Sequence, residues 1–108
     1  MKRGEVWWVG FDPALGSEIR KTRPAVIVSN DAANRHLARV VVIPVTSHAD
    51  RLYPGEAAIT LNGERRKALT DQIMAADKSR LTTRLGALSK VDMQNVESAI
   101  KLHLGLPR

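Results

Sequence analysis

Arg23 stands where a basic, polar stretch of the chain gives way to an apolar one. Residues 20–23 read RKTR, and after Pro24 residues 25–28 read AVIV. β-Branched side chains favour a strand, and proline, which has no N–H to donate, is tolerated at the start of a strand rather than in its middle. The pattern predicts a guanidinium at the mouth of a rigid strand, where its charged donors could stabilise a phosphate or a transition state. The alternative is an arginine that is simply solvated on a loop.

Polar residues also lie on two other predicted strands. Thr46, Ser47 and His48 stand at the end of the apolar strand 38–46, and Asp71 and Gln72 lie on the strand after a later hairpin. Consecutive strands most often pair antiparallel, so the start of one lies beside the end of the next. If the second and third strands pair in this way, Arg23 and Thr46 are neighbours. Without that pairing, Thr46 is an ordinary β-former at a strand end.

An arginine and a hydroxyl that converge on one point suit the self-cleavage of RNA. In that reaction the ribose 2′-OH attacks the adjacent phosphate, and fixed donors stabilise the charge that builds on the non-bridging oxygens. The nucleophile belongs to the substrate, so the protein need supply neither a nucleophile nor a metal. The residue types leave the general base open, with His48 and Asp71 as the two candidates.

Other kinds of chemistry lack support in the sequence. There are no cysteines, which excludes disulfides and thiolate metal sites. His36, His48 and His103 lack the spacing of a metal site, and the seven glycines do not form a phosphate-binding loop. There is no GxSxG motif, so a serine hydrolase is not indicated. We therefore expect no metal and no cofactor.

Composition indicates one globular domain, residues 1–108, with an excess of positive charge. Seventeen Lys and Arg face eleven Asp and Glu, giving a net charge of +6, and this excess favours a polyanionic partner such as nucleic acid. The basic residues are spread along the chain, so a basic patch requires folding. No signal peptide or long apolar run is visible, and we expect a soluble, cytoplasmic protein.

Most of the chain reads as short strands, expected at residues 5–11, 24–29, 38–46, 56–61, 65–70 and 82–88. Asn62 and Gly63 predict a hairpin turn, and Pro44 predicts an interrupted ladder near the end of its strand. Polar loops are expected at 12–23 and 47–54, and a turn at 30–34. Residues 70–74 are expected to continue as a strand or its edge, and residues 77–80 to form a helical turn capped by Asp77.

A C-terminal helix is predicted to begin after Ser89, with Asp92 in a capping-box-like position, and to end at Gly105. One face carries Val96, Ala99, Ile100, His103 and Leu104. His103 is therefore expected to be a core or interface residue rather than a ligand. The expected fold is mainly β with a C-terminal helix (α+β), a small β-barrel or compact sheet with the helix packed on it.

The chain resembles the MazF/PemK (Kid-like) family of toxin endoribonucleases over nearly its whole length. The resemblance rests on KRGEVWWVGFDPALGSE, TRPAVIVSND, VVIPVTS, DQIMAADKSRL and LGALSKVDMQNVESAIKLHLGL. It implies an SH3-like β-barrel of the CcdB/MazF type and a homodimer. It also implies metal-free, ribosome-independent cleavage of single-stranded RNA at short sequence motifs, leaving 2′,3′-cyclic phosphate and 5′-OH ends. An acidic antitoxin protein would be the regulator, lying across the basic groove and displacing a gating loop.

The same resemblance assigns roles to individual residues. The family's catalytic arginine and threonine fall on Arg23 and Thr46. Residues implied to bind RNA are Ser17 and Glu18 of the gating loop, Arg20, Lys21, Ser47 and Gln72. Asp71 matches the acid of the Kid branch, but that branch's partner arginine falls on Leu69, which favours the arrangement of Arg23 with Thr46. Met74 replaces an arginine of many relatives, which leaves the sequence preference open.

Two other functions remain in view. One is a non-catalytic toxin that poisons a protein target, as the related CcdB does with DNA gyrase; such a binder has no need of Arg23 and Thr46. The other is a general binder of single-stranded nucleic acid, which would need several exposed aromatic side chains. The aromatic residues available are Trp7, Trp8, Phe11 and Tyr53.

Overall fold

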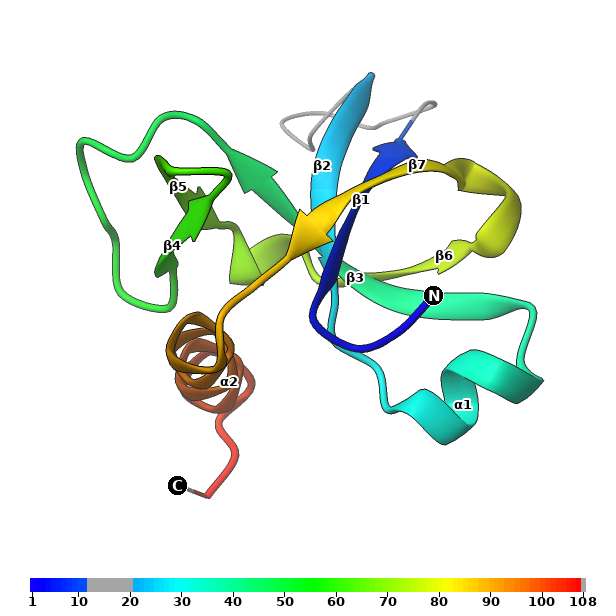
Figure 1. The fold of residues 1–108 in the computed structure, drawn as a ribbon. Helices are drawn as coiled ribbons and strands as arrows, with labels where there is room; N and C mark the ends of the chain where they lie inside the picture. The colour runs from blue at the N-terminus through cyan, green and yellow to red at the C-terminus, as the bar shows by residue number, and fades with distance from the viewer. Residues whose placement is uncertain (12–20, 108) are drawn as a thin grey trace.

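A computed structural model describes residues 1–11 and 21–107 of the chain (Figure 1). Its helices and strands, in order, are β1 (Glu5–Gly10), β2 (Thr22–Ile27), α1 (Asp31–His36), β3 (Arg39–Thr46), β4 (Ala57–Leu61), β5 (Glu64–Ala68), the 3-10 turn η1 (Thr70–Gln72), β6 (Met74–Asp77), the 3-10 turn η2 (Lys78–Arg80), β7 (Leu81–Ala87) and α2 (Lys90–Leu104). The expected class, mainly β with a C-terminal helix, is confirmed. None of the helices in the described residues is long and apolar enough to cross a membrane.

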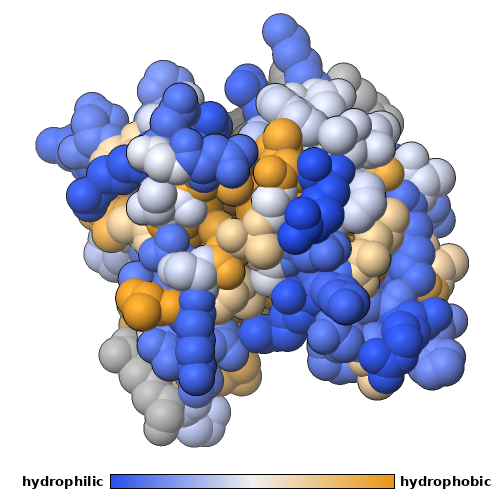
Figure 2. Space-filling view, in the orientation of Figure 1, coloured by the Kyte–Doolittle hydropathy of each residue, from blue (hydrophilic) through white to orange (hydrophobic). Residues whose placement is uncertain are grey.

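The described strands form one strongly curled antiparallel sheet. The strand order is β4-β5-β3-β2-β1-β7, and β6 pairs with β3 off this path. In Figure 1 the connection from β6 to β7 bends over one side of the sheet, and α2 lies below the β4–β5 hairpin. Hydrophilic residues cover most of the face shown in Figure 2, and apolar residues are visible mainly along its middle.

β3 is the strand that the rest of the sheet is built around. Its one edge pairs with β2, while its other edge pairs first with β6, through residues 39–42, and then with β5, through Val45 and Thr46. Pro44 lies between these two ladders and is itself fully buried. The predicted interruption at Pro44 is confirmed, because a residue without an N–H fits the place where the outer partner changes.

The segment after β5 departs from the prediction. Residues 70–74 were expected to continue as a strand, but Thr70–Gln72 form the 3-10 turn η1 before β6 begins at Met74. Ala68 pairs with Val45, and Met74 pairs with Val42. The chain between them, residues 69–73, therefore runs alongside only two residues of β3, namely residues 43 and 44. The surplus residues cannot stay in the ladder, so they form a turn that is held by the hydrogen bond from Leu69 N–H to the Pro44 carbonyl, 2.8 Å.

Two hydrophobic clusters pack against the two faces of the sheet. One lies under α2 and includes Val26, Ile43 and Val96, and the other lies on the opposite face and includes Ile27 and Val42. Both clusters draw on β2 and β3, because successive side chains of a strand point to opposite faces. These two strands are therefore buried on both sides, as the unbroken apolar runs predicted.

The predicted caps of α2 and η2, Ser89 and Asp77, are confirmed, but the Asp92 carboxylate accepts from the Thr60 N–H at 2.9 Å and does not close a capping box. The Ser89 hydroxyl accepts from the Asp92 N–H at 3.1 Å, and Gly105 ends α2 in the left-handed conformation, with φ of 68°. Asp77 Oδ1 accepts from the Ser79 N–H at 2.9 Å. The turn predicted at 30–34 is a longer element, the helix α1, and Asn30 caps it by accepting from the Ala33 N–H.

His103 was predicted to be a core or interface residue; the core position is wrong, and the interface position stays a prediction. The face of α2 is buried at Val96 and Ala99, but His103 and Leu104 are exposed. The last turn of the helix extends beyond the sheet that its earlier turns cover, so His103 stays exposed and approaches the described chain at the Gly55 backbone. Three leucines near this end, Leu102, Leu104 and Leu106, are each about half exposed.

Candidate active site

The start of β2 and the end of β3 meet at one end of the sheet. The two strands pair through Ala25↔Pro44, Val26↔Ile43 and Ile27↔Val42. Extending this register by two residues sets Arg23 opposite Thr46, and residues opposite each other project from the same face. The predicted antiparallel pairing of the second and third strands is confirmed. A direct contact between the two side chains stays a prediction.

Arg23 is presented to solvent from a firmly held strand. It pairs with Val9 of β1, and the residues that follow it, from Pro24 to Ile27, are buried. Within the described residues, its guanidinium makes neither a hydrogen bond nor an ion pair. Its donors are therefore open toward a ligand, because an arginine that serves the fold is normally paired with an acceptor.

Thr46 is half-buried, and a local turn fixes its hydroxyl. The Thr46 Oγ1 accepts a hydrogen bond from the backbone N–H of His48 at 3.3 Å. Since a hydroxyl can accept and donate at once, its proton stays free for a further acceptor. The side chains of Ser47 and His48, which follow Thr46 in this turn, are exposed.

Lys67 is a member of this region that sequence reasoning missed. It pairs directly with Thr46 across β3 and β5, and it is only 7% exposed. Its ammonium donates to the Arg51 carbonyl at 2.8 Å and to Glu56 Oε1 at 2.9 Å. Lys67 therefore ties the loop that follows Thr46 to the strand beside it. Its burial depends on that loop folding back over β5, which no local pattern in the sequence reveals.

Asp71 and Gln72 lie on η1, and Gln72 is half-buried. Asp71 is exposed and lines a hollow of about 310 Å³ together with Tyr53 and His103. Among the described residues there is no hydrogen bond or ion pair between Asp71 and Arg23 or His48. The structure thus brings Arg23, Thr46 and His48 to one end of the sheet and gives Asp71 different neighbours.

Several predicted binding residues lie outside the described chain, namely Ser17, Glu18 and Arg20. Lys21, the first residue after that gap, is exposed and has a φ of 65°. Its carbonyl accepts from the Phe11 N–H at 2.9 Å, so the two ends of the gap lie side by side, next to Arg23. The described residues contain no cluster of three His, Asp or Glu side chains that could hold a metal ion.

Comparison with known proteins gives consistent matches. A family model described as "PemK-like, MazF-like toxin of type II toxin-antitoxin system" matches residues 2–104. The chain is 40% identical over 115 residues to "Endoribonuclease MazF9" of Mycobacterium tuberculosis, and the match covers 98% of each protein.

Solved structures agree with the sequence matches. The chain resembles MazF of Deinococcus radiodurans with a TM-score of 0.86 and 28% identity, over 98% of this chain and 97% of that one. It resembles an endoribonuclease in complex with its cognate antitoxin, from Mycobacterial species, with a TM-score of 0.84 and 28% identity, over 100% of this chain and 98% of that one. These likenesses confirm a barrel of the MazF type.

Proposed function

Because this chain belongs to the PemK-like, MazF-like toxin family of type II toxin–antitoxin systems, we propose that it is an endoribonuclease toxin in which Arg23 and Thr46 carry the cleavage of single-stranded RNA. The observation that supports these roles is the register of β2 and β3, which sets the two residues opposite each other on one face. Endoribonuclease relatives disfavour the alternative of a toxin that poisons gyrase without catalysis.

In this reaction the RNA supplies the nucleophile, and the protein supplies hydrogen-bond donors. The ribose 2′-OH attacks the adjacent phosphorus, the bond to the 5′ oxygen breaks, and the products carry a 2′,3′-cyclic phosphate and a 5′-OH. Negative charge builds on the non-bridging oxygens, where the Arg23 guanidinium and the Thr46 hydroxyl each donate a hydrogen bond. The backbone of His48 fixes the Thr46 oxygen, so this donor is oriented before the substrate arrives.

His48 is the better of the two candidates for the proton of the 2′-OH. It belongs to the same turn as Thr46, and a neutral imidazole nitrogen can accept a proton. Asp71 faces the hollow beside Tyr53 instead. The His48→Gln variant should lose most of the cleavage rate, whereas Asp71→Asn should keep it. The opposite result would move the role to Asp71.

RNA is held in this proposal by charged and polar groups around the two catalytic residues. Lys21 and Arg23 supply positive charge, and Ser47 and Gln72 supply hydrogen bonds. Ser17, Glu18 and Arg20 belong to the segment that leads into Lys21, and we assign them to RNA binding on the family resemblance. No metal or cofactor takes part in these steps.

Regulation and assembly follow from the family as well. An acidic antitoxin would compete with RNA for the basic surface, since both partners are polyanionic. One related structure is an endoribonuclease bound to its cognate antitoxin. We also propose that residues 1–108 act as one domain, that two copies form a homodimer, and that the toxin works in the cytoplasm without the ribosome.

The test incubates the purified protein in EDTA with a pool of random-sequence single-stranded RNA and maps the cut ends. Discrete cuts that end in cyclic phosphate support the proposed chemistry and give the recognised motif. Cuts that end in 3′-OH would contradict attack by the 2′-OH. Intact RNA, with a correctly folded protein, would overturn the enzyme and return the gyrase poison to consideration.

A further inference from the structure

We propose that the hollow lined by Tyr53, Asp71 and His103, here called the Tyr53 hollow, holds one base of the RNA near the cleaved phosphate. The inference rests on the proposed RNA cleavage and adds to it a specificity site. Its full lining is Tyr53, Pro54, Gly55, Glu56, Asp71 and His103, and its volume is about 310 Å³. The lining thus combines an aromatic ring, a carboxylate and an imidazole around a space large enough for a single base.

The wall that carries Tyr53 is a rigid turn. The Glu56 N–H donates to the Tyr53 carbonyl at 3.0 Å, and the Tyr53 N–H donates to Glu56 Oε1 at 2.8 Å. Between them stand Pro54 and Gly55, and Gly55 has a φ of +87°, as the third residue of a type II turn requires. The turn therefore exists before any ligand binds, which lowers the entropy lost on binding.

Lys67 connects this turn to the catalytic strand. Its ammonium binds Glu56 Oε1 at 2.9 Å and lies 5.2 Å from the centre of the Tyr53 ring. Since Lys67 is also the cross-strand partner of Thr46, a single lysine side chain separates the Tyr53 turn from the proposed catalytic threonine. In the proposal, the base in the Tyr53 hollow and the phosphate at Thr46 therefore lie on the two sides of Lys67.

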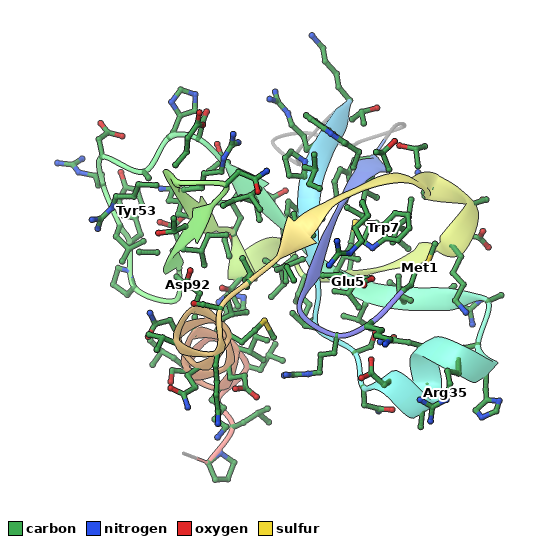
Figure 3. All side chains as sticks on the ribbon, in the orientation of Figure 1. Met1, Glu5, Trp7, Arg35, Tyr53 and Asp92 are labelled. Carbon is green, nitrogen blue, oxygen red and sulfur yellow. The ribbon has the colours of Figure 1, made fainter. Side chains whose placement is uncertain are left out.

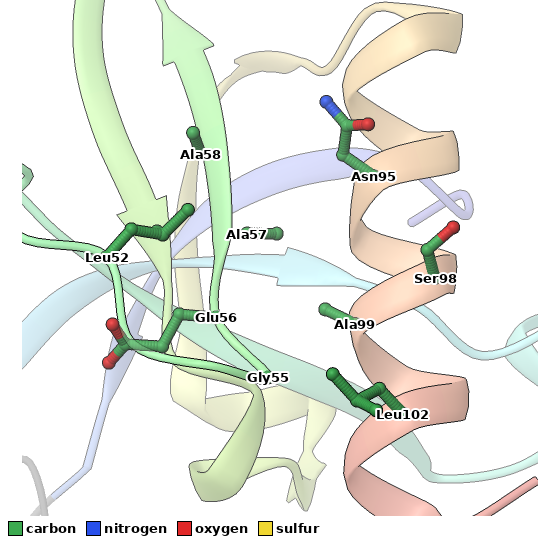
Figure 4. Close-up of a pocket in the computed structure, with 9 residues that line it drawn as sticks. All are labelled: Leu52, Gly55, Glu56, Ala57, Ala58, Asn95, Ser98, Ala99 and Leu102. Carbon is green, nitrogen blue, oxygen red and sulfur yellow. The ribbon is translucent and has the colours of Figure 1, made fainter.

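The C-terminal helix supports the turn from its other side. A groove of about 400 Å³ runs between residues 52–58 and α2, and in Figure 4 Ala99 and Leu102 point across it toward the Gly55 backbone. His103, one residue further along the helix, packs against Gly55, where an added Cβ would meet its Nδ1 at 3.7 Å. This contact explains why an exposed histidine at the end of α2 can line the Tyr53 hollow.

The lining suggests which bases fit. Tyr53 is 53% exposed, and Lys67 Nζ and Arg51 Cζ lie 5.2 Å and 5.8 Å from the centre of its ring. A base would stack on the part of the ring that these two cations leave open. The Asp71 carboxylate only accepts hydrogen bonds, so it favours the bases with an exocyclic amino group, cytosine, adenine and guanine. Uracil presents a carbonyl oxygen in place of the amino group of cytosine, and two facing acceptors repel. The Glu56 carboxylate is neutralised by Lys67, so it adds little repulsion toward the phosphates.

The test is a double-mutant cycle that combines enzyme variants with RNA substrates in which one base has been removed. Once the cut motif is mapped, a set of oligonucleotides carries one abasic nucleotide at each position in turn, and kcat/KM is measured with wild type and Tyr53→Leu. At one position near the cut, we expect the abasic change to cost wild type about tenfold and to cost Tyr53→Leu much less. Tyr53→Phe, which keeps the ring, and Leu52→Ala, which lines the neighbouring groove, should behave as wild type.

A second variant tests the base preference at the same position. Asn in place of Asp71 offers an amide donor, so Asp71→Asn should accept uracil there several-fold better, relative to cytosine, than wild type does. Cleavage by wild type without any coupling between Tyr53 and a single position would overturn the base site alone. Failure of wild type to bind or cleave any RNA would overturn the proposed function and this inference together.

Discussion

Two regions of the molecule, the N-terminal corner and the strand ends around Arg23, differ in how far their polar side chains are hydrogen-bonded within the protein. In the corner, formed by Arg3, Glu5, Asp31 and Asn34, each of these side chains has partners. Glu5 Oε1 accepts from the Lys2 N–H at 2.8 Å and from Trp7 Nε1 at 3.0 Å, and its Oε2 accepts from Arg84 at 3.1 Å. Figure 3 shows Glu5 and Trp7 close together on β1, at the other side of the molecule from Tyr53.

At the strand ends the groups are oriented by the backbone and left open. Thr46 Oγ1 has a single backbone donor, and Arg23 makes no hydrogen bond or ion pair with the described residues. Polar groups that the fold needs are paired inside it, whereas groups that act on a ligand keep their donors available. The contrast separates residues that should affect stability from residues that should affect RNA cleavage, and each prediction below tests one side of it.

The largest effect is expected for Arg23→Ala. Loss of a charged donor to the transition state should lower kcat/KM for RNA about 10²- to 10³-fold, while the melting temperature should stay unchanged. The measurement is the initial rate of cleavage of an oligonucleotide that carries the mapped motif, with thermal unfolding in parallel. Arg35→Ala is the matched control, because Arg35 is also exposed but lies in the last turn of α1. Equal losses in both variants would mean that net charge, and not this site, carries the activity.

Thr46 should give a smaller effect of the same kind. Thr46→Val keeps the shape of the side chain but removes the hydroxyl, so cleavage should fall about 10- to 100-fold, whereas Thr46→Ser should retain most of the rate. Single-turnover rates at saturating protein separate this loss from weaker RNA binding. If Thr46→Val were as active as wild type, the Thr46 hydroxyl would have no part in cleavage and would serve only the structure, as the polar groups of the N-terminal corner do.

Asn34 represents the other side of the contrast. It is only 2% exposed, and its amide donates to the Ser29 carbonyl at 2.9 Å and to Asp31 at 3.3 Å. Asn34→Ala leaves these acceptors without a buried donor and should lower the free energy of unfolding by about 1–3 kcal/mol. Urea unfolding at a fixed protein concentration measures the loss, and Asn95→Ala, exposed on α2, is the control. The cleavage rate of the folded fraction should not change.

The strands and their pairing could be predicted from the sequence because they depend on local chemistry. The β-branched runs around Val26 and Val41, the Asn62-Gly63 turn and the Ser89 cap each act within a few residues. The position of Arg23 beside a strand and of Thr46 at the end of the next one followed from the same signals. Antiparallel pairing of neighbours then brought their strand ends together without any long-range information.

The features that the sequence could not predict depend on the register of distant strands. The turn η1 exists because residues 69–73 pass only two residues of β3, and this surplus appears only once both ladders are known. The burial of Lys67 and the exposure of His103 likewise depend on where the loop after β3 and the end of α2 come to lie. The Tyr53 hollow joins three such segments, so no single stretch of sequence indicates it.

The smallest effect is expected at Glu5, where substitution should lower the stability of the folded protein by an amount that depends on pH. Burial acts to raise the pKa of its carboxyl, but the hydrogen bonds from Lys2, Trp7 and Arg84 outweigh it and hold the pKa below the ordinary value of 4.5. A lowered pKa in the folded state means that ionised Glu5 stabilises the protein above pH 4.5, and that this stability is lost as the pH falls through the folded pKa.

Glu5→Gln tests this assignment at both ends of the pH range. Near pH 7 the variant should be less stable than wild type by about 1 kcal/mol, with an unchanged cleavage rate. Below pH 4.5 the two unfolding curves should converge, because the wild-type carboxyl becomes protonated and neutral like the amide. Both proteins should keep some acid sensitivity, since hydrogen bonds from Arg3 to Asp31 and from Ser79 to Asp77 lower the pKa of those carboxyls as well. A stability difference that stayed constant with pH would mean that shape and hydrogen bonding, and not the charge of Glu5, hold this corner together.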